Sequence, residues 1–295
     1  MLVGLRHICD FFDRVHFGVG LGAIIASFVA VLVCSCLSGC AQEQEKSQPD
    51  LEYKTELMDE GALKVLTALD YPPFEAGSVE EPWGYDVAVA QEIADRLGLT
   101  LELVSVPRTD IVSMLACEPS SATSEEEQVV PQGDIALAAL AITAQRDDKV
   151  DFSSWYYVGD QAVIALDGAH QSTTEFDREK TRIAVVKGST CLDTARSLTS
   201  EKLVVEYSSA RKCLEALQAK EVQAAVLDLP VATYLLEDEF TGMRIIEQIM
   251  TGEAYGIAVP TQSGHLKDAI NDVLQEMEED GALERLEDQY MRPAR

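Results

Sequence analysis

The sequence predicts an α/β protein with a parallel or mixed sheet, and two observations support this. Strand-like and helix-like segments alternate along most of the chain, as in the strand–helix–strand units of such sheets. The segment 134–140 is nearly continuously apolar, as expected for a strand covered on both faces. With 295 residues, of which 47% are hydrophobic and 25% charged, the chain is long enough for one large domain or two ordinary ones.

The first predicted strand covers 63–69 and leads into the loop 71–74 (YPPF), whose prolines stop any helix. A helix is expected over 84–98, because apolar residues recur every four positions and Gly98 stands where helices end. Asp86 is expected to cap this helix through its side chain.

A strand at 101–106 and a short helix near 111–116 follow. The stretch 117–133 is polar and acidic, which predicts a solvated surface insertion. The apolar strand over 134–140 is followed by the polar break 143–149. A segment rich in aromatic residues comes after this break.

The rest of the chain repeats the alternation and ends in a helix whose apolar stripe is interrupted at Gly281. The expected strands are 162–166, 182–186, 203–207, 222–227 and 254–259. The expected helices are one that follows 187–190 and has Leu192 and Ala195 on one side, 210–219, 266–277 and 283–290.

The charge balance is strongly acidic. The chain has 23 basic and 51 acidic residues, a net charge of −28. Such a surface repels phosphate backbones and anionic lipid headgroups, so we expect no nucleic-acid partner.

The N-terminus has the features of an export signal. Basic residues precede the uncharged run 17–37, and Leu37-Ser38-Gly39-Cys40 resembles a bacterial lipobox. We therefore expect a signal peptide over 1–39 and a lipidated, polar tether over 40–61, with lipid on Cys40 holding the protein on the extracytoplasmic face of the cell membrane. A retained transmembrane anchor is the alternative.

Three cysteines remain beyond the lipobox: Cys117, Cys191 and Cys213. In an oxidising compartment Cys191 and Cys213 can pair, or Cys213 can stay a buried thiol on the apolar face of its helix. No metal-binding spacing is present, and we expect no cofactor.

Six motifs in one order resemble the extracytoplasmic solute-binding proteins (family 3 type) of polar amino-acid ABC transporters, from about Leu63 to Tyr290. They are YPPFE at 71–75, GYDVAVAQEIADRLG at 84–98, AITAQRDDKVDFS at 141–153, AVVKGST at 184–190, ALQAKEVQAAVLDLP at 216–230 and YGIAV at 255–259.

The resemblance implies a type II periplasmic-binding-protein-like fold: two α/β lobes joined by two crossing strands at the hinge. Lobe one is expected to comprise 62–157 plus 255–295, and lobe two 158–254. A free amino acid would bind in the cleft, and the protein, which we expect to be a monomer, would deliver it to an ABC-transporter permease. The same fold includes cyclohexadienyl dehydratase-like enzymes and ligand-sensing domains, which are the alternative functions.

The resemblance also implies a ligand site. Arg146 would bind the α-carboxylate, which suits a planar guanidinium, with help from the helix start at Ser189 and Thr190. Asp228 would bind the α-ammonium, and Tyr71 and Phe74 would line the side-chain pocket.

Two positions depart from the family pattern. Ala139 and Ala141 lie in the segment before Arg146 and are expected to line the ligand site. Ala141 stands where many relatives have Ser or Thr, so the hydrogen bond that those residues give to the ligand carboxylate must come from another group. Arg108 lies where relatives often place an aromatic residue. It either recognises an acidic or carbonyl-bearing ligand side chain or is a solvated surface arginine.

For the other site residues, structural roles remain as alternatives. Arg146 can pair with a neighbouring aspartate, Asp228 and the Ser189–Thr190 pair can cap helices, and Tyr71 and Phe74 can be core aromatics.

Overall fold

The computed structural model describes residues 51–116 and 131–291 of the chain. The predicted signal peptide, Cys40, the first part of the tether and most of the acidic insertion lie outside these ranges. Within them, no helix has the length and apolar character needed to cross a membrane.

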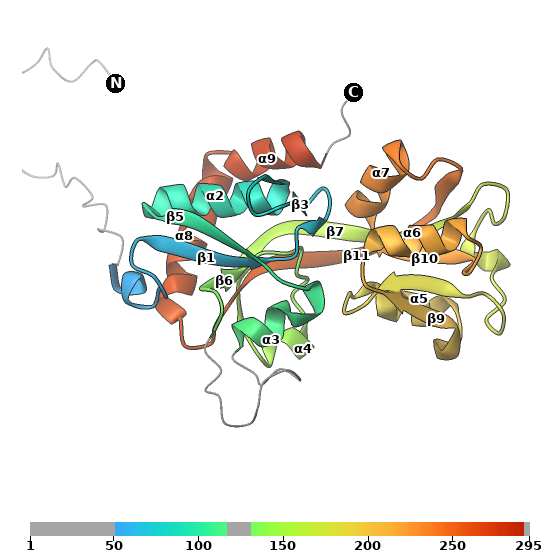
Figure 1. Cartoon of the computed structure of the whole chain (residues 1–295), viewed down its shortest axis with the longest axis horizontal. Coiled ribbons are helices and arrows are strands. Elements are labelled where there is room, and N and C mark those ends of the chain that lie inside the picture. The colour runs from blue at the N-terminus through green and yellow to red at the C-terminus, as the bar shows by residue number, and fades with distance from the viewer. Residues whose placement is uncertain (1–50, 117–130, 292–295) are drawn as a thin grey trace, which may run out of the picture. The chain divides into compact units, whose positions relative to one another are not determined.

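The described chain is an α/β protein, as predicted, and its main sheet has eight strands in the order β5-β1-β6-β11-β7-β10-β8-β9 (Figure 1). Both outer parts of this sheet are parallel, whereas β11 runs antiparallel to β6 and β7, and β7 antiparallel to β10. The strands are β1 (Ala62–Thr67), β5 (Thr100–Ser105), β6 (Ile135–Ala136), β7 (Asp151–Leu166), β8 (Ile183–Val186), β9 (Val204–Tyr207), β10 (Ala224–Asp228) and β11 (Met243–Val259). A small second sheet contains β2 (Asp70–Tyr71), β3 (Glu75–Gly77) and β4 (Pro82–Trp83).

The long strands β7 and β11 belong to both halves of the sheet. Near one end of their ladder β11 pairs with β6 through Ala258 and Ala136, and near the other end β7 pairs with β10 through Ile164 and Ala225. The ladder between them shifts register between Ile249 and Glu253 and again after Tyr255. These two strands therefore connect lobe one to lobe two, in agreement with the two predicted crossings.

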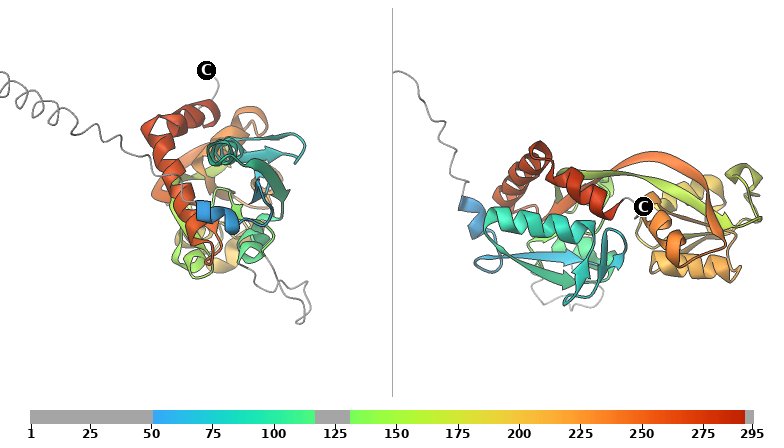
Figure 2. Two further views of the ribbon diagram at one scale, coloured as in Figure 1. Left: turned by 90° about the vertical axis from the view of Figure 1, so that its left-hand side faces the viewer. Right: turned by 90° about the horizontal axis from the view of Figure 1, so that it is seen from above.

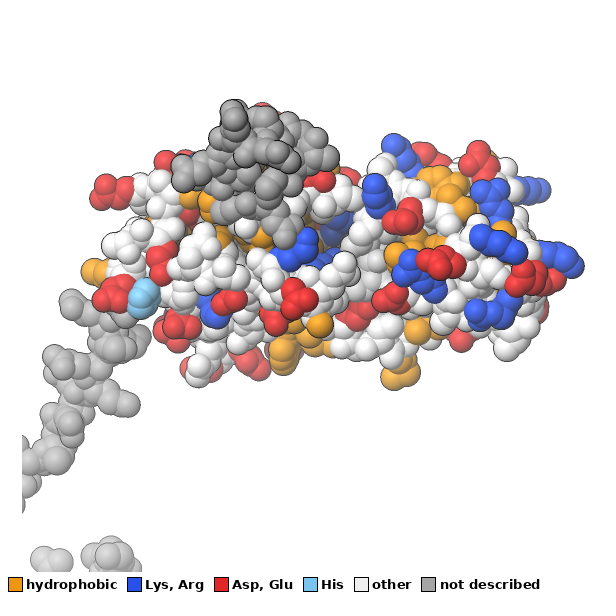
Figure 3. Space-filling view, turned by 90° about the horizontal axis from the view of Figure 1, so that it is seen from below, with side chains coloured by type: hydrophobic (Ala, Val, Ile, Leu, Met, Phe, Trp, Pro, Cys, Tyr) orange, Lys and Arg blue, Asp and Glu red, His pale blue; other side chains and the backbone are white. Residues whose placement is uncertain are grey.

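Helices cover both faces of the sheet in each lobe (Figures 1 and 2), which explains why the strands are apolar on both sides. The helices are α2 (Tyr85–Leu97), α3 (Ile111–Leu115), α4 (Ala144–Asp147), α5 (Cys191–Leu198), α6 (Ala210–Gln218), α7 (Leu229–Asp238), α8 (Gly264–Glu279) and α9 (Ala282–Tyr290), with 3-10 turns η2 (Leu51–Thr55), η3 (Arg108–Asp110), η4 (Thr173–Glu175) and η5 (Glu201–Leu203). On the face shown in Figure 3, basic side chains gather over the lobe-two end and are interspersed with acidic ones.

The folded body begins earlier than the sequence suggested. Tyr53 in η2 is only 2% exposed and donates its hydroxyl to the Leu97 carbonyl at 2.9 Å. The Glu56 carboxylate accepts the backbone N–H groups of His265 and Leu266 at the start of α8, at 3.3 and 2.7 Å. Residues 51–56 are thus packed on lobe one and differ from the polar tether expected for 40–61.

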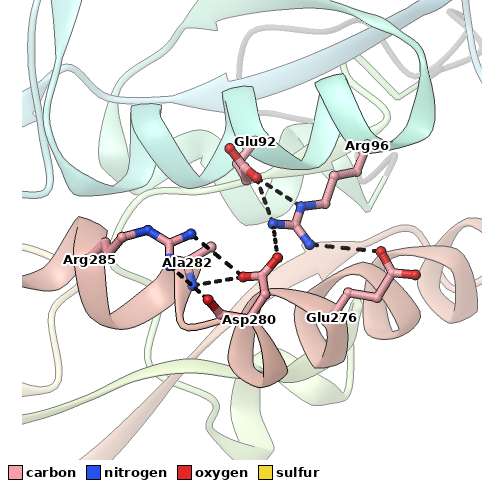
Figure 4. Close-up of polar contacts among 6 residues, drawn as sticks. All are labelled: Glu92, Arg96, Glu276, Asp280, Ala282 and Arg285. Atoms are coloured by element: carbon pink, nitrogen blue, oxygen red, sulfur yellow. Dashed lines mark hydrogen bonds and ion pairs between the residues drawn. The ribbon is translucent and has the colours of Figure 1, made fainter.

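Arg96 connects three helices of lobe one (Figure 4). From α2 it binds Glu92 in its own helix, Glu276 in α8 at 3.8 Å and Asp280 between α8 and α9 at 2.7 Å. Asp280 also accepts the backbone N–H of Ala282 at 2.9 Å, and Arg285 donates to the Asp280 carbonyl at 2.7 Å. The break expected at Gly281 is therefore a fixed corner between two helices.

Cys191 and Cys213 are both buried free thiols, so the structure excludes the disulfide between them. Cys213 packs in the apolar core of lobe two, as one of the two sequence interpretations predicted.

Candidate functional site

A small cavity lies where loops and strand ends of the two lobes meet. Its walls combine two arginines, one aspartate, two tyrosines and backbone from both lobes. It is lined by Tyr71, Arg108, Ala139, Ala141, Arg146, Gly188, Ser189, Thr190, Asp228 and Tyr255. The structure thus brings together all the predicted ligand-binding residues except Phe74, and adds Gly188 and Tyr255.

Arg146 enters the cavity from α4, a single helical turn within the polar break expected over 143–149. The Thr143 hydroxyl starts this turn by accepting the Arg146 backbone N–H at 3.3 Å. The guanidinium donates Nη1 to the Ala141 carbonyl at 2.7 Å and Nη2 to the Gly188 carbonyl at 3.1 Å. Burial and the nearby Arg108 lower the pKa of Arg146, so a carboxylate at this point would relieve an unfavourable buried charge.

The start of α5 faces the same cavity from lobe two. Thr190 is the N-cap residue, but its hydroxyl does not cap the helix; it donates to Glu253 at 2.8 Å. Ser189 donates its hydroxyl to the Val186 carbonyl at 2.8 Å. The side-chain capping expected as the alternative role is therefore absent at Thr190, and the helix start itself presents positive dipole to the cavity.

Asp228 ends β10 and stands at the N-cap position of α7, yet its side chain makes no capping hydrogen bond. It is 5% exposed and points across to lobe one, where Tyr71 donates its hydroxyl to Oδ2 at 2.8 Å. The Cys191 thiol lies 3.5 Å from Oδ1. Burial raises the pKa of Asp228, and the bond from Tyr71 opposes that shift. A buried carboxylate in this position would gain from a cationic partner.

Arg108 is not a solvated surface residue: its side chain is only 9% exposed. Nη1 donates to the Ala138 carbonyl at 2.6 Å, Nη2 forms a short ion pair with Glu75, and the guanidinium carbon lies 4.0 Å from the centre of the Tyr71 ring. Burial alone would lower the pKa of Arg108, but Glu75 and Tyr71 hold it above its ordinary value. No periodicity in the sequence marks this ion pair, since its members are 33 positions apart.

Phe74 does not reach the cavity. It is fully buried, with its ring 6.4 Å from Tyr71, 5.2 Å from Tyr157 and 5.5 Å from Tyr255. It therefore supports the wall formed by Tyr71 and Tyr255, which is the core-aromatic role that the sequence left open. The sequence offered one signal for Tyr255 as a cavity residue, because it is the first residue of the YGIAV motif, which lies in β11.

Asp86 does not cap α2, whose N-cap residue is Gly84. Its carboxylate instead accepts the Ala139 backbone N–H at 2.6 Å and the Tyr156 hydroxyl at 2.8 Å. Ala139 has a positive φ of 46°, a conformation that alanine rarely adopts, so the bond that its N–H donates to Asp86 holds the cavity wall in an otherwise unfavourable backbone geometry.

The cavity measures only about 10 Å³, space for about one water molecule. Contacts between the lobes close it, in particular Tyr71 to Asp228 and Arg146 to Gly188. A larger hollow of about 780 Å³ lies between β7, α8 and α9. Its charged lining residues are all acidic, so it lacks the opposed charges that the small cavity offers.

The fold defines the class of protein as a two-lobe, type II periplasmic-binding-protein-like chain. A family profile described as bacterial extracellular solute-binding proteins, family 3, matches residues 63–293, and the chain belongs to this family.

Three relatives illustrate the similarity. The ABC transporter glutamine-binding protein GlnH of Bacillus subtilis (strain 168) is 25% identical over 272 residues, 90% of this chain and 93% of that protein. The arginine-binding extracellular protein ArtP of the same strain is 23% identical over 269 residues, 89% of this chain and 95% of its own. A solved ancestral arginine-binding protein bound to glutamine is 26% identical with a TM-score of 0.68, and the match covers 79% of this chain and 98% of that one.

Proposed function

We propose that this protein captures a free amino acid between its lobes and delivers it to the permease of an ABC transporter. The observation that carries the proposal is the pair of opposite charges on facing lobes, the partly buried Arg146 from lobe one and the buried Asp228 from lobe two. An amino-acid backbone has the matching carboxylate and ammonium groups, and it would replace contacts that these residues now make with the protein.

The relatives support this function, because their names describe amino-acid-binding proteins and an ABC transporter component. Catalysis is not part of the proposal. We further propose that residues 1–39 are removed, that Cys40 carries lipid, and that the monomeric protein is held on the extracytoplasmic face of the cell membrane.

Isothermal titration of the full chain, purified in mild detergent, tests the proposal directly. We expect saturable binding of at least one common L-amino acid. Arg146→Lys keeps the positive charge but loses the planar pair of donors, so it should weaken binding by about 10-fold or more. Arg211→Lys, at an exposed ion pair of lobe two, is the matched control and should bind as the wild type does. Absence of binding to every amino acid would overturn the proposed function.

A further inference from the structure

Arg108 forms part of the wall that an incoming ligand side chain must meet. It lines the same cavity as Arg146 and Asp228, and it is stacked against Tyr71 at 4.0 Å. Arg146 and Asp228 are assigned above to the carboxylate and ammonium common to all amino acids. Arg108 is therefore the charged residue of the cavity that is left to distinguish one amino acid from another.

The positive charge of Arg108 is already compensated inside lobe one. Glu75 is fully buried and forms an ion pair with it, and Asp86, also buried, lies next to Glu75. Burial raises the pKa of Glu75, and Asp86 raises it further; burial raises the pKa of Asp86 as well. Even if the two carboxyl groups retain one proton between them, one negative charge remains opposite the guanidinium. An added ligand carboxylate would thus find no uncompensated cation here.

Two polar groups in the cavity wall remain without partners among the described residues. One is the Nε–H of Arg108, whose Nη atoms are already engaged. The other is the hydroxyl of Tyr255, which lies near Asp228 and lowers its pKa, and whose oxygen is left free to accept a hydrogen bond. A buried N–H donor without an acceptor lowers the free energy of unfolding. A ligand atom that accepts this N–H removes that cost, so its hydrogen bond contributes more to binding than a bond that only replaces one with water. The first group requires an acceptor, and the second can accept a hydrogen bond or donate one.

We infer that Arg108 and Tyr255 select an amino acid whose side chain ends in a neutral carboxamide. This inference rests on the proposed function and names its substrate class. The carboxamide oxygen would accept the Nε–H of Arg108, and its –NH₂ would donate to the Tyr255 hydroxyl. Basic side chains are disfavoured by Arg108, because Asp228 is the only acidic residue among those lining the cavity and is used by the α-ammonium.

Titration of the full chain with four kinds of L-amino acid tests the inference: glutamine and asparagine, glutamate and aspartate, lysine and arginine, and norleucine. We expect one of the two amides to bind about 10- to 100-fold more tightly than norleucine and about 10-fold or more tighter than its acid counterpart, as loss of a charge-assisted hydrogen bond implies. If an acidic, basic or apolar amino acid binds most tightly, the inference is wrong while the proposed function stands. If none binds, both are wrong.

Variants assign the preference to Arg108. Arg108→Lys keeps a charge opposite Glu75 but lacks the guanidinium group and its Nε–H. It should reduce the preference for the amide over norleucine to about 3-fold or less. Arg211→Lys should keep the full preference. If Arg108→Lys does not fold, as judged by circular dichroism, the double variant Glu75→Gln/Arg108→Met removes both charges and serves the same measurement. Full preference retained in a folded Arg108 variant would overturn the assignment.

Discussion

Asp228 is a buried carboxylate that forms no direct ion pair among the described residues, although Arg108 lies close enough to lower its pKa. Its partners are the hydroxyl of Tyr71 and the thiol of Cys191, and burial raises its pKa. Such a group lowers the stability of the unliganded fold at neutral pH, a pattern often found at binding sites. Asp228→Asn keeps the shape and can still accept the Tyr71 hydroxyl. We expect a higher melting temperature without ligand and amino-acid binding weakened by about 10-fold or more.

The pH dependence of binding provides an independent check on Asp228. Because the pKa of Asp228 is higher in the folded state, the native protein binds this proton more tightly than the unfolded chain does. The contribution of Asp228 to stability therefore falls as pH rises from its unfolded pKa to its folded pKa. Binding of an α-ammonium requires the ionised form, so affinity should be constant at neutral pH and decrease as pH falls through the raised pKa. Calorimetric titrations from neutral to mildly acidic pH measure this. A wild-type profile as flat as that of Asp228→Asn would contradict the assigned role.

The residues that the sequence misjudged share one property: their partners are distant in the chain. The sequence leaves Arg108 open as either a cleft residue or a solvated surface arginine, because its ion pair with Glu75 and its stacking on Tyr71 exist only after folding. Asp86 is expected to cap α2 because it opens the apolar repeat, but the N-cap residue is Gly84, two positions earlier, and the Asp86 carboxylate accepts the Ala139 backbone N–H instead. The grouping of Arg146, Thr190 and Asp228 was predictable only through the family motifs.

At the scale of helices, the corner formed by α2, α8 and α9 depends on Arg96, whose side chain is 19% exposed. Arg96→Met keeps the apolar stem but removes the bonds to Glu92, Glu276 and Asp280. We expect a melting temperature lower by about 2–4 °C, since each partly exposed ion pair contributes little by itself. The bond from Arg96 lowers the pKa of Asp280, so this contribution is present at neutral pH and is lost as pH falls through the lowered value.

Arg285→Met is the matched control, because Arg285 contacts Asp280 only within the corner itself. It should change the melting temperature less than Arg96→Met does. If differential scanning calorimetry gives the same melting temperature for both variants, the ion pairs between α2 and α8 do not contribute to stability.

Most helices and strands could be predicted because their periodicity is local. The apolar stripe interrupted at Gly281 corresponds to α8 and α9, and the apolar run before Asp228 corresponds to β10. The strand expected over 134–140 is shorter: only Ile135–Ala136 pairs as β6, because the chain turns at Ala139 to form the cavity wall. The η2 turn was missed since a single anchoring residue, Tyr53, leaves no periodic pattern.

For the whole molecule, ligand entry requires the lobes to separate, because the closed cavity of about 10 Å³ cannot hold an amino acid. The bond from Tyr71 to Asp228 joins the two lobes, and the ligand ammonium would replace it. Tyr71→Phe removes this bond while keeping the ring beside Arg108. We expect the unliganded variant to populate open forms, with a larger radius of gyration by small-angle X-ray scattering, and to bind up to about 5-fold more tightly, because less closed protein must open first.

Tyr85→Phe is the control for this experiment, since the Tyr85 hydroxyl donates to the Tyr156 carbonyl at 3.1 Å within lobe one. It should leave the radius of gyration unchanged. With saturating ligand, Tyr71→Phe and the wild type should reach the same radius, because the ammonium then occupies Asp228 in both. If the unliganded Tyr71→Phe protein scatters as the wild type does, the hydroxyl does not hold the lobes together, and closure must depend on Arg146 and the Gly188 carbonyl instead.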